Sequence, residues 1–362
     1  MKTSFPFSTF TFIYFMNLDI LSQEEIISLR SLIDASQNIV ICCHKSPDGD
    51  AIGSSLAWAD YLKSKEKNVR VTIPDACPDF LQWLPGFAQT VTRYDKHPDE
   101  VKDLFAHADL ILCLDFNVSA RLEDMQPVLD QTKAPKVLVD HHIGPNIPDA
   151  KLVISHEEMC STCELSFRIL WQLGEFEKMS KACAVSLYCG MMTDTGGFTY
   201  NSTRPEIFLI ISHLLEKGVD KDDIYNRVNH NYSTWCLRMR GYMMMQKLNV
   251  YEDLHASYFT LTREEMQRFH YIKGDAEGLV NEPLKIKGLK LSIYLREDTV
   301  KDNLIFVSLR SSCGFHCKQV AERFFNGGGH ADAAGGKLYC SIDEAKEVAK
   351  QAIKYFAEEL KK

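Results

Sequence analysis

Lys136-Val137-Leu138-Val139-Asp140-His141-His142 is the stretch around which the rest of the sequence can be arranged. A short apolar run rich in valine ends abruptly in an acid and two imidazoles. Such a run, bounded by polar residues, is typical of a buried strand in a parallel sheet. In open α/β sheets, ligands bind just beyond the carboxyl ends of the strands. The stretch therefore predicts a strand that delivers Asp140, His141 and His142 to a binding site.

Two other apolar runs repeat this pattern. Residues 39–43 lead directly into His44, and residues 110–114 lead directly into Asp115. Three strands would thus place acids and histidines at one edge of one sheet. These side chains are the ligands of a metal site.

The sequence up to residue 203 alternates such strands with helical segments. Ser22-Gln23-Glu24-Glu25 has the form of a capping box and predicts a helix to about residue 35. Further strands are expected at 69–73 and 152–154, and further helices at 51–65, 161–173 and 181–192, of which the second begins with another capping box, Ser161-Thr162-Cys163-Glu164. Strands separated by helices form βαβ units, so we expect an α/β fold with a mostly parallel sheet flanked by helices.

The sequence changes character after residue 203. Residues 204–247 are helical and more polar, without a strand pattern, and are interpreted as a connector. The remainder is rich in strand patterns, at 256–261, 289–295 and 303–309, with helices expected at 263–269 and 316–325. We therefore expect a first domain at 17–203, a helical connector at 204–247 and a smaller α/β domain at 248–362.

Composition limits the classes of function. The chain has 362 residues, which is enough for two domains, and its apolar content of 45% can form a sizeable core. A net charge of −8 argues against a protein that follows long nucleic acids through an extended basic field. Several of the twelve cysteines lie inside apolar runs, which favours reduced core thiols in a cytoplasmic protein over a disulfide framework.

Residues 1–16 need a separate interpretation. They are aromatic, and Lys2 is their only charged residue. The segment is short for a membrane span, and no small-residue cleavage site follows it. A second methionine, Met16, directly precedes an amphipathic segment. We interpret residues 1–16 as a disordered or mis-started extension, with a weak export signal as the alternative, and we expect no membrane association.

The polar residues at the strand ends, together with one acid after the helix at 181–192, form a candidate ligand set. Its members are His44, Asp48, Asp50, Asp115, Asp140, His141, His142 and Asp194. So many acids would repel one another without a cation. Two cations about 3.5–4 Å apart that share one carboxylate would account for their number, and mixed Asp and His ligands favour Mn²⁺ over Mg²⁺. Any single member could instead be a helix cap, a partner in an ion pair or a core histidine. Because acids and histidines recur at the ends of three strands, a metal site is favoured.

Five motifs, in order, resemble those of the DHH phosphoesterases. They are His44-Lys45-Ser46-Pro47-Asp48-Gly49-Asp50, Asp115, Asp140-His141-His142, Thr193-Asp194-Thr195-Gly196, and Gly327-Gly328-Gly329-His330 followed by Ala333-Ala334-Gly335. Each motif alone is weak, but the five fit in order and spacing over residues 16–339. Glu277-Gly278-Leu279-Val280-Asn281 and Ser308-Leu309-Arg310-Ser311 are similar to the two-domain oligoribonuclease/pAp-phosphatase (nano-RNase A-like) members.

The resemblance implies a role for each motif residue. One Mn²⁺ would be held by His44, Asp48 and Asp115, and the other by Asp50, Asp115, His141 and Asp194, with Mg²⁺ or Co²⁺ as alternative ions. Asp115 would bridge the ions, Asp140 would orient the ligands, and His142 would contact the scissile phosphate or leaving group. The second domain would bind substrate across a cleft through Arg310, Ser311, Gly327, Gly328, Gly329 and His330. Asn326 departs from the pattern, because many relatives have a glycine there.

The activity implied is hydrolysis of phosphate esters by a metal-activated water, on short RNA oligonucleotides and on pAp. Two alternatives stay open. One is a phosphodiesterase of cyclic dinucleotides or of linear pApA, and the other is a catalytically inactive nucleotide-binding protein. The aromatic and methionine-rich segment 235–245 is interpreted as core or as the surface of a homodimer.

Overall fold

The computed structural model describes residues 17–362, and the expected extension at 1–16 lies outside them. The chain folds into two compact units. Unit 1 comprises residues 17–75 and 84–224, and unit 2 comprises residues 76–83 and 225–362. The division falls inside helix α9 (Lys221–Asn229), so the segment expected as a connector, 204–247, is shared between the units.

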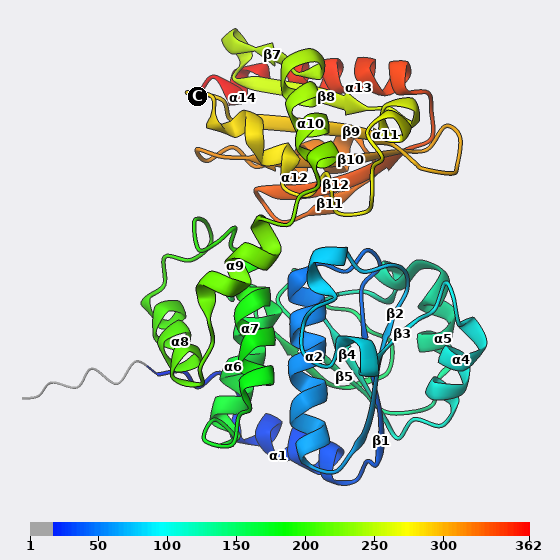
Figure 1. Ribbon diagram of the computed structural model, residues 1–362, viewed down its shortest axis with the longest axis vertical. Coiled ribbons are helices and arrows are strands. Elements are labelled where there is room, and N and C mark those ends of the chain that lie inside the picture. The colour runs from blue at the N-terminus through cyan, green and yellow to red at the C-terminus, as the bar shows by residue number, and fades with distance from the viewer. Residues whose placement is uncertain (1–16) are drawn as a thin grey trace, which may run out of the picture. The chain divides into compact units, whose positions relative to one another are not determined.

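Unit 1 is built on a six-stranded sheet of order β3-β2-β1-β4-β5-β6 (Figure 1). Its strands are β1 (Asn38–Cys43), β2 (Asn68–Ile73), β3 (Val91–Arg93), β4 (Leu110–Leu114), β5 (Lys136–Asp140) and β6 (Ala150–Ser155). All neighbouring strands pair in parallel. Every residue of β4 and β5 is buried, as expected for a sheet covered on both faces. The predicted parallel sheet is confirmed.

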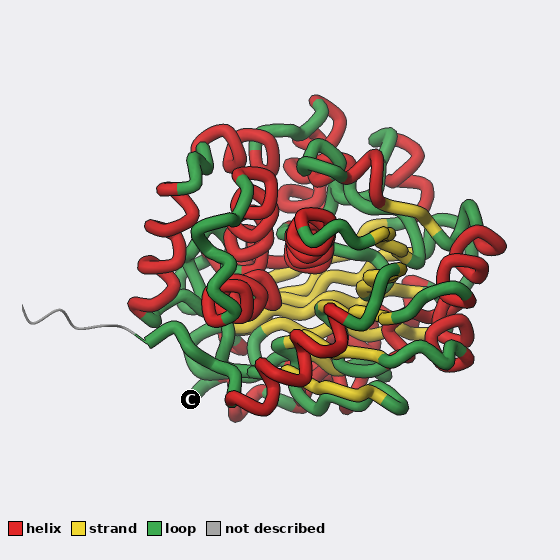
Figure 2. The backbone as a smooth tube through the Cα atoms, turned by 90° about the horizontal axis from the view of Figure 1, so that it is seen from below, coloured by secondary structure: helices red, strands yellow, loops and turns green. Residues whose placement is uncertain are grey.

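Helices lie on both sides of this sheet (Figure 2). Helices α2 (Gly49–Ser64), α6 (Thr162–Gln172) and α7 (Lys181–Asp194) pack together on one side. On the other side are α4 (Pro98–Ala106), η2 (Ser119–Met125) and α5 (Gln126–Gln131), where Phe105, Leu122 and Leu129 bury against Val40 and Cys113 of the sheet. The remaining helices of unit 1 are α1 (Gln23–Asp34), α3 (Phe87–Thr90) and α8 (Pro205–Glu216).

The order of the strands reverses between β1 and β4. From β1 the chain runs to β2 and β3 at one edge, and it then returns to β4, beside β1, and continues to β5 and β6. In doubly wound sheets, the crevice at the carboxyl ends of the two strands that flank such a reversal is the usual ligand site. His44 and Asp115 follow β1 and β4 directly, so both lie at this position.

Unit 2 is built on a mixed sheet of order β11-β12-β10-β9-β8-β7. Its strands are β7 (Asn249–Tyr251), β8 (Ala256–Leu261), β9 (Leu291–Glu297), β10 (Ile305–Ser311), β11 (Gly328–Gly329) and β12 (Ala333–Leu338). Strands β8 and β9 are parallel, and the other neighbouring pairs are antiparallel. The sequence predicts β8, β9 and β10 but not β12, because Ala333-Ala334-Gly335-Gly336 lacks the large apolar side chains of a typical strand.

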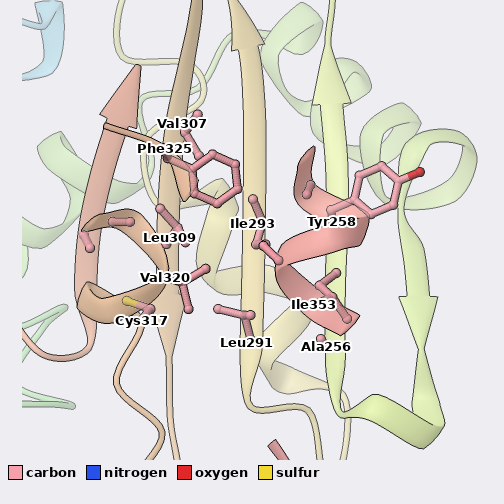
Figure 3. Close-up of a cluster of buried hydrophobic side chains, with 14 of the residues drawn as sticks. Ala256, Tyr258, Leu291, Ile293, Val307, Leu309, Cys317, Val320, Phe325 and Ile353 are labelled. Carbon is pink, nitrogen blue, oxygen red and sulfur yellow. The ribbon is translucent and has the colours of Figure 1, made fainter. Parts of the chain in front are cut away.

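Each face of the second sheet has its own core. Figure 3 shows one of them, in which Ile293 and Leu309 meet Val320 and Phe325, at α12 (Lys318–Phe324), and Ile353 of α13 (Ile342–Tyr355). The opposite face is covered by α10 (Thr234–Tyr242), η3 (Met243–Lys247), α11 (Arg263–Arg268) and η5 (Leu279–Lys285). Short helices η1 (Asp79–Leu81), η4 (Glu252–Leu254) and α14 (Ala357–Leu360) complete unit 2.

The segment 235–245 is partly core. Met239 and Met243 are buried in the second face of this sheet, as predicted, whereas Trp235 and Met245 are 40% and 83% exposed. Within residues 17–362, none of the helices combines the length and apolar character needed to cross a membrane.

Candidate metal centre

The strand-end residues of unit 1 converge on Asp115. This residue follows β4 with a φ of +64°, a left-handed conformation that is sparsely populated by residues other than glycine. Its side chain is 2% exposed. Its Oδ2 lies 3.4 Å from His44 Nε2, and its Oδ1 lies 3.6 Å from His141 Nε2. The two oxygens of one buried carboxylate therefore face two different imidazoles.

His44, Asp48 and Asp115 form the first metal-capable group, in which one ligand atom from each residue lies within 4.8 Å of the others. The Nδ1 atom of His44 lies 2.8 Å from the carbonyl oxygen of Lys45, which turns Nε2 toward the two carboxylates. This Nε2 atom is buried and makes no hydrogen bond within residues 17–362. An unsatisfied ring nitrogen between two carboxylates fits a metal ion, because neutral imidazole is a common metal ligand.

Asp50, Asp115 and His141 form the second metal-capable group, and all three are buried. Asp194, the last residue of α7, places Oδ2 3.6 Å from His141 Nε2. The Nδ1 atom of His141 lies 3.3 Å from the carbonyl oxygen of Met159, so Nε2 is again turned toward carboxylates. Asp115 belongs to both groups, as a bridging carboxylate would.

The first turn of α6 supports both groups, which the sequence does not predict. The two oxygens of Asp50 accept hydrogen bonds from the backbone N–H groups of Thr162, at 2.6 Å, and Cys163, at 2.8 Å. The Thr162 hydroxyl donates to Asp115 Oδ1 at 2.9 Å. Backbone donors at a helix N-terminus are natural partners of a carboxylate. The signal in the sequence is Ser161-Thr162-Cys163-Glu164, which predicts a helix cap and no more.

The cap itself differs in part from the prediction. Ser161 accepts from the backbone N–H of Glu164 at 3.0 Å, as a cap should. The Glu164 carboxylate does not close the predicted capping box; it accepts from Cys160 N–H at 2.8 Å and pairs with Arg168 and Arg204. Glu164 is fully buried, so its charge must be neutralised by partners such as the two arginines. A capping box would not supply that opposite charge. Through Cys160, this network holds residues 159–160 against α6. It thereby also positions the Met159 carbonyl group, which faces His141.

Asp140 and His142 form a pair beside the two groups. The fully buried Asp140 accepts from the backbone N–H of His142 at 3.1 Å, and its Oδ1 lies 2.7 Å from His142 Nδ1. The other ring nitrogen, Nε2, accepts from Arg121 Nη1 at 2.9 Å. Arg121, in η2, is missing from the residues that the sequence predicts for the site. Its place in the segment that follows Asp115 is the signal that could reveal it.

Neighbouring imidazoles stabilise the charged form of Asp115. Burial acts to raise the pKa of this carboxyl group, but the imidazoles of His44, His142 and His141 outweigh burial and hold the pKa well below its ordinary value. Asp115 is therefore an anion in the neutral pH range. A permanent anion at the centre of two groups of ligand atoms is what a bridging ligand requires.

The second group is electrostatically strained without a cation. Burial, reinforced by Asp115 and Asp194, raises the pKa of Asp50 well above its ordinary value. Burial lowers the pKa of His141, but the carboxylates of Asp194, Asp115 and Asp50 overcome this effect and raise that pKa to about 9. Both shifts show that the group retains protons in the absence of another positive charge.

The arginine and serine predicted for substrate binding lie at the end of β10 and have different environments. The half-buried Arg310 donates to the carbonyl group of Leu309 at 3.0 Å and has no ion pair with a carboxylate in residues 17–362. The Ser311 side chain is buried, and its hydroxyl accepts from the backbone N–H of Cys317 at 3.0 Å, at the start of α12. Arg310 is thus available to a ligand, whereas Ser311 also has a structural task.

The glycine-rich stretch is partly a strand, because β11 pairs with β12. A Cβ atom on Gly327 would lie 1.8 Å from the carbonyl oxygen of Gly335, and one on Gly329 would lie 2.5 Å from that of Ala333. A Cβ atom on Gly328 would meet nothing within 4 Å. Close approach of two backbones therefore explains two of the three glycines, and Gly328 has open space beside it. His330, half-buried, donates its backbone N–H to the Ala333 carbonyl at 2.8 Å.

Comparison with known proteins identifies the family. Residues 38–191 match the model of the DHH family, N-terminal domain, and residues 257–359 match that of the DHHA1 domain. The chain belongs to the DHH family of phosphoesterases and is therefore a hydrolase.

Three relatives align with most of the chain. The crystal structure of an exopolyphosphatase-related protein from Bacteroides fragilis has a TM-score of 0.89 and 45% identity, over 95% of this chain and 99% of that one. The bifunctional oligoribonuclease and PAP phosphatase NrnA of Thermus thermophilus is 27% identical, over 87% of this chain and 89% of its own length. The cyclic-di-AMP phosphodiesterase PdeA of Listeria monocytogenes is 24% identical, over 90% of this chain and 49% of its own length.

Proposed function

We propose that this protein is a Mn²⁺-dependent phosphoesterase that hydrolyses short oligoribonucleotides to mononucleotides and dephosphorylates pAp to AMP. The observation that carries the proposal is the position of Asp115, whose two oxygens face His44 and His141 in two metal-capable groups. Catalysis of phosphoryl transfer depends mainly on positioning and charge neutralisation. Two cations that share one carboxylate supply both.

The residues present fit two such cations. The first would be held by His44, Asp48 and Asp115, and the second by Asp50, Asp115, His141 and Asp194. The unsatisfied Nε2 atom of His44 is the donor that most requires an ion. Mixed nitrogen and oxygen ligands suit Mn²⁺ better than Mg²⁺, which prefers oxygen ligands and water. When bound, the cations would lower the pKa of a water molecule and neutralise charge on the phosphate.

The side chains beside the cations would carry out the remaining steps. Asp140 holds His142 through two contacts, one with its backbone N–H group and one with its ring Nδ1 atom. With Nδ1 held by Asp140, Nε2 is the atom through which His142 would exchange a proton with the leaving oxygen or contact the phosphate. Asp140 would thus be a positioning residue, and His142 would be the residue that touches the substrate.

The two domains would divide the work. We propose that residues 17–203 carry the catalytic site, that residues 248–362 bind the substrate and that residues 204–247 connect them. Arg310 offers a guanidinium group that has no carboxylate partner among residues 17–362, which suits a phosphate, and Gly328 leaves space beside its backbone. The net charge of −8 provides no extended basic groove, so substrates of a few nucleotides should be preferred over long strands.

A second candidate is hydrolysis of cyclic di-AMP or linear pApA. The similarity to a cyclic-di-AMP phosphodiesterase, at 24% identity, is close to the 27% identity with an oligoribonuclease and PAP phosphatase. One assay separates these functions: the protein is given Mn²⁺ with pAp, an RNA dinucleotide, an RNA 24-mer, cyclic di-AMP or polyphosphate, and Asp115→Ala is the inactive control. We expect the highest kcat/KM for pAp and the dinucleotide. Preferred turnover of cyclic di-AMP or polyphosphate would overturn the proposal, and nucleotide binding without any turnover would indicate an inactive binding protein.

A further inference from the structure

Arg121 is held firmly beside the candidate metal centre. Its backbone carbonyl accepts from Lys45 N–H at 2.9 Å, and its own N–H donates to the Val118 carbonyl at 3.1 Å. The next residue, Leu122, is fully buried in the core between η2 and the sheet. The segment that carries Arg121 is therefore attached both to the loop after β1 and to the core. The backbone from which the Arg121 side chain extends is thus fixed in position.

The guanidinium group of Arg121 contacts His142, whose Nδ1 atom lies 3.7 Å from Oδ1 of the shared carboxylate of Asp115. It donates to His142 Nε2 at 2.9 Å. The backbone carbonyl group of Arg121 accepts from the N–H of Lys45, the residue that follows His44. Arg121 is thus bonded both to His142 and to the loop that carries His44 and Asp48.

Arg121 forms no ion pair with any carboxylate of residues 17–362. Its hydrogen bond to His142 is its sole polar side-chain contact in residues 17–362. Glu123, a nearby carboxylate in the sequence, pairs with Lys45 instead. A guanidinium group carries five N–H donors and keeps its charge in proteins, so most of its binding capacity is unused. Planar arrays of such donors match the oxygens of a phosphate.

The contact with His142 also defines the resting state of that imidazole. An arginine N–H can only donate, so Nε2 of His142 must accept and the ring proton lies on Nδ1, where it faces Asp140. A ligand that attracts the guanidinium group would release Nε2. One anion could therefore bind Arg121 and free His142 in the same step.

We propose that Arg121 binds the phosphate group under attack and exchanges its contact with His142 for the phosphate oxygens when the substrate enters. This inference rests on the proposed phosphoesterase function and adds a substrate-binding residue to it. It also gives the two arginines different roles. Arg121 contacts the phosphate that reacts, whereas Arg310 binds a phosphate that does not.

The test compares Arg121→Ala, Arg121→Lys and Arg310→Ala with the wild type on two substrates, pAp and the small diester bis-p-nitrophenyl phosphate. The matched control is Arg93→Ala, because Arg93 pairs with Asp95 at 2.7 Å and lies in the same unit. Loss of one charge-assisted contact should lower kcat/KM of Arg121→Ala about 10- to 150-fold on both esters. Arg121→Lys should retain part of the activity, and added guanidinium ion should restore Arg121→Ala several-fold. Arg93→Ala should match the wild type.

A second measurement does not need turnover. Calorimetric titration of the Mn²⁺-loaded protein with inorganic phosphate or AMP should show affinity about tenfold or more lower for Arg121→Ala, with an unchanged count of bound Mn²⁺. If the wild type hydrolyses no phosphate ester but this difference appears, the proposed function fails, and Arg121 remains a phosphate-binding residue without a role in hydrolysis. Phosphate affinity and kcat/KM of Arg121→Ala within about threefold of the wild type would overturn the assignment. So would a loss of activity that guanidinium does not restore and that is accompanied by loss of bound Mn²⁺, because Arg121 would then be purely structural.

Discussion

The residues predicted for the site occupy contrasting environments in the two units. In unit 1, Asp50 and Asp115 are buried, and the first turn of α6 donates two hydrogen bonds to Asp50 and one to Asp115. In unit 2, Arg310 and Gly328 are only half-buried and make few polar contacts. An ion requires several ligand atoms fixed at short range, whereas a phosphate can be captured by one charged group and exposed backbone. Substitutions in unit 1 should therefore abolish chemistry, and those in unit 2 should weaken capture.

The largest effect is expected for Asp115→Ala. Removing the shared carboxylate disturbs both groups of ligand atoms and leaves the remaining acids facing one another. A metal pair contributes several kcal/mol to the stabilisation of the transition state, and each 1.36 kcal/mol is tenfold in rate, so kcat/KM should fall by about 10³-fold or more. Steady-state kinetics and the count of bound Mn²⁺ measure the two consequences.

The matched control for this substitution is Asp109→Asn. Asp109 precedes β4, as Asp115 follows it, and its carboxylate accepts from the backbone N–H groups of Gln37 and Asn38. Its loss should lower stability slightly and leave turnover unchanged. Full turnover by folded Asp115→Ala would refute the two-metal interpretation, and equal losses in the two variants would assign the effect to stability.

Arg310→Ala should have the next largest effect, and it should affect substrate binding but not the chemical step. The lost charge-assisted contact is worth about 1.5–3 kcal/mol, or about 10- to 150-fold in kcat/KM for pAp. The loss should appear mainly in KM, with wild-type Mn²⁺ content. Hydrolysis of bis-p-nitrophenyl phosphate, which lacks a second phosphate, should be nearly unchanged. An equal loss on both esters would place Arg310 at the chemical step and remove the division of labour between the units.

The strands and the strand-end residues could be predicted because their signals are local. The run before Asp140 and the capping box at Ser22 are each contained in a few residues, and the structure has both β5 and the capped α1. The sheet brings His44, Asp115 and His141 together because parallel strands end at one edge. No tertiary detail beyond strand order is needed for that prediction.

The parts that could not be predicted depend on contacts between distant segments. Thr162 reaches Asp115 because α6 packs over the sheet, and Arg121 reaches His142 because η2 joins the core on the other side. The sequence marks a helix cap at Ser161 and a segment after Asp115, but it does not show that Thr162 or Arg121 contacts the site. Strands β11 and β12 were hidden for another reason: their glycines and alanines give no apolar pattern, and their pairing is set by close backbone approach.

Thr162→Val tests whether the environment of the unit 1 carboxylates matters as much as the carboxylates themselves. The substitution keeps the shape of the side chain and removes the hydroxyl that donates to Asp115 at 2.9 Å. Loss of such a partner typically costs 10- to 100-fold in metal affinity, so Mn²⁺ binding should weaken by about that factor. Thr72→Val is the control, because its buried hydroxyl donates to the carbonyl group of Ile41, away from the candidate ligands, and should leave affinity unchanged. Equal Mn²⁺ affinity in the two variants would show that α6 does not support the site.

The smallest effects separate two neighbouring glycines of unit 2. Gly327→Ala would force a methyl group against the backbone of β12 and should lower the free energy of unfolding by about 1–3 kcal/mol. Gly328→Ala meets open space and should change stability by less than about 0.5 kcal/mol, while weakening substrate binding if the amide of this residue contacts a phosphate. Denaturant unfolding and KM for pAp measure the two responses. Equal stability of the variants would contradict the structural role given to Gly327.

The most direct test of the central claim, that Asp115 bridges two cations, is an anomalous difference map from crystals of the wild-type protein grown with Mn²⁺. We expect two peaks about 3.5–4 Å apart. One should lie beside His44 and Asp48, the other should lie beside Asp50, His141 and Asp194, and one oxygen of Asp115 should contact each. A single peak, or a second peak that Asp115 does not touch, would contradict the claim.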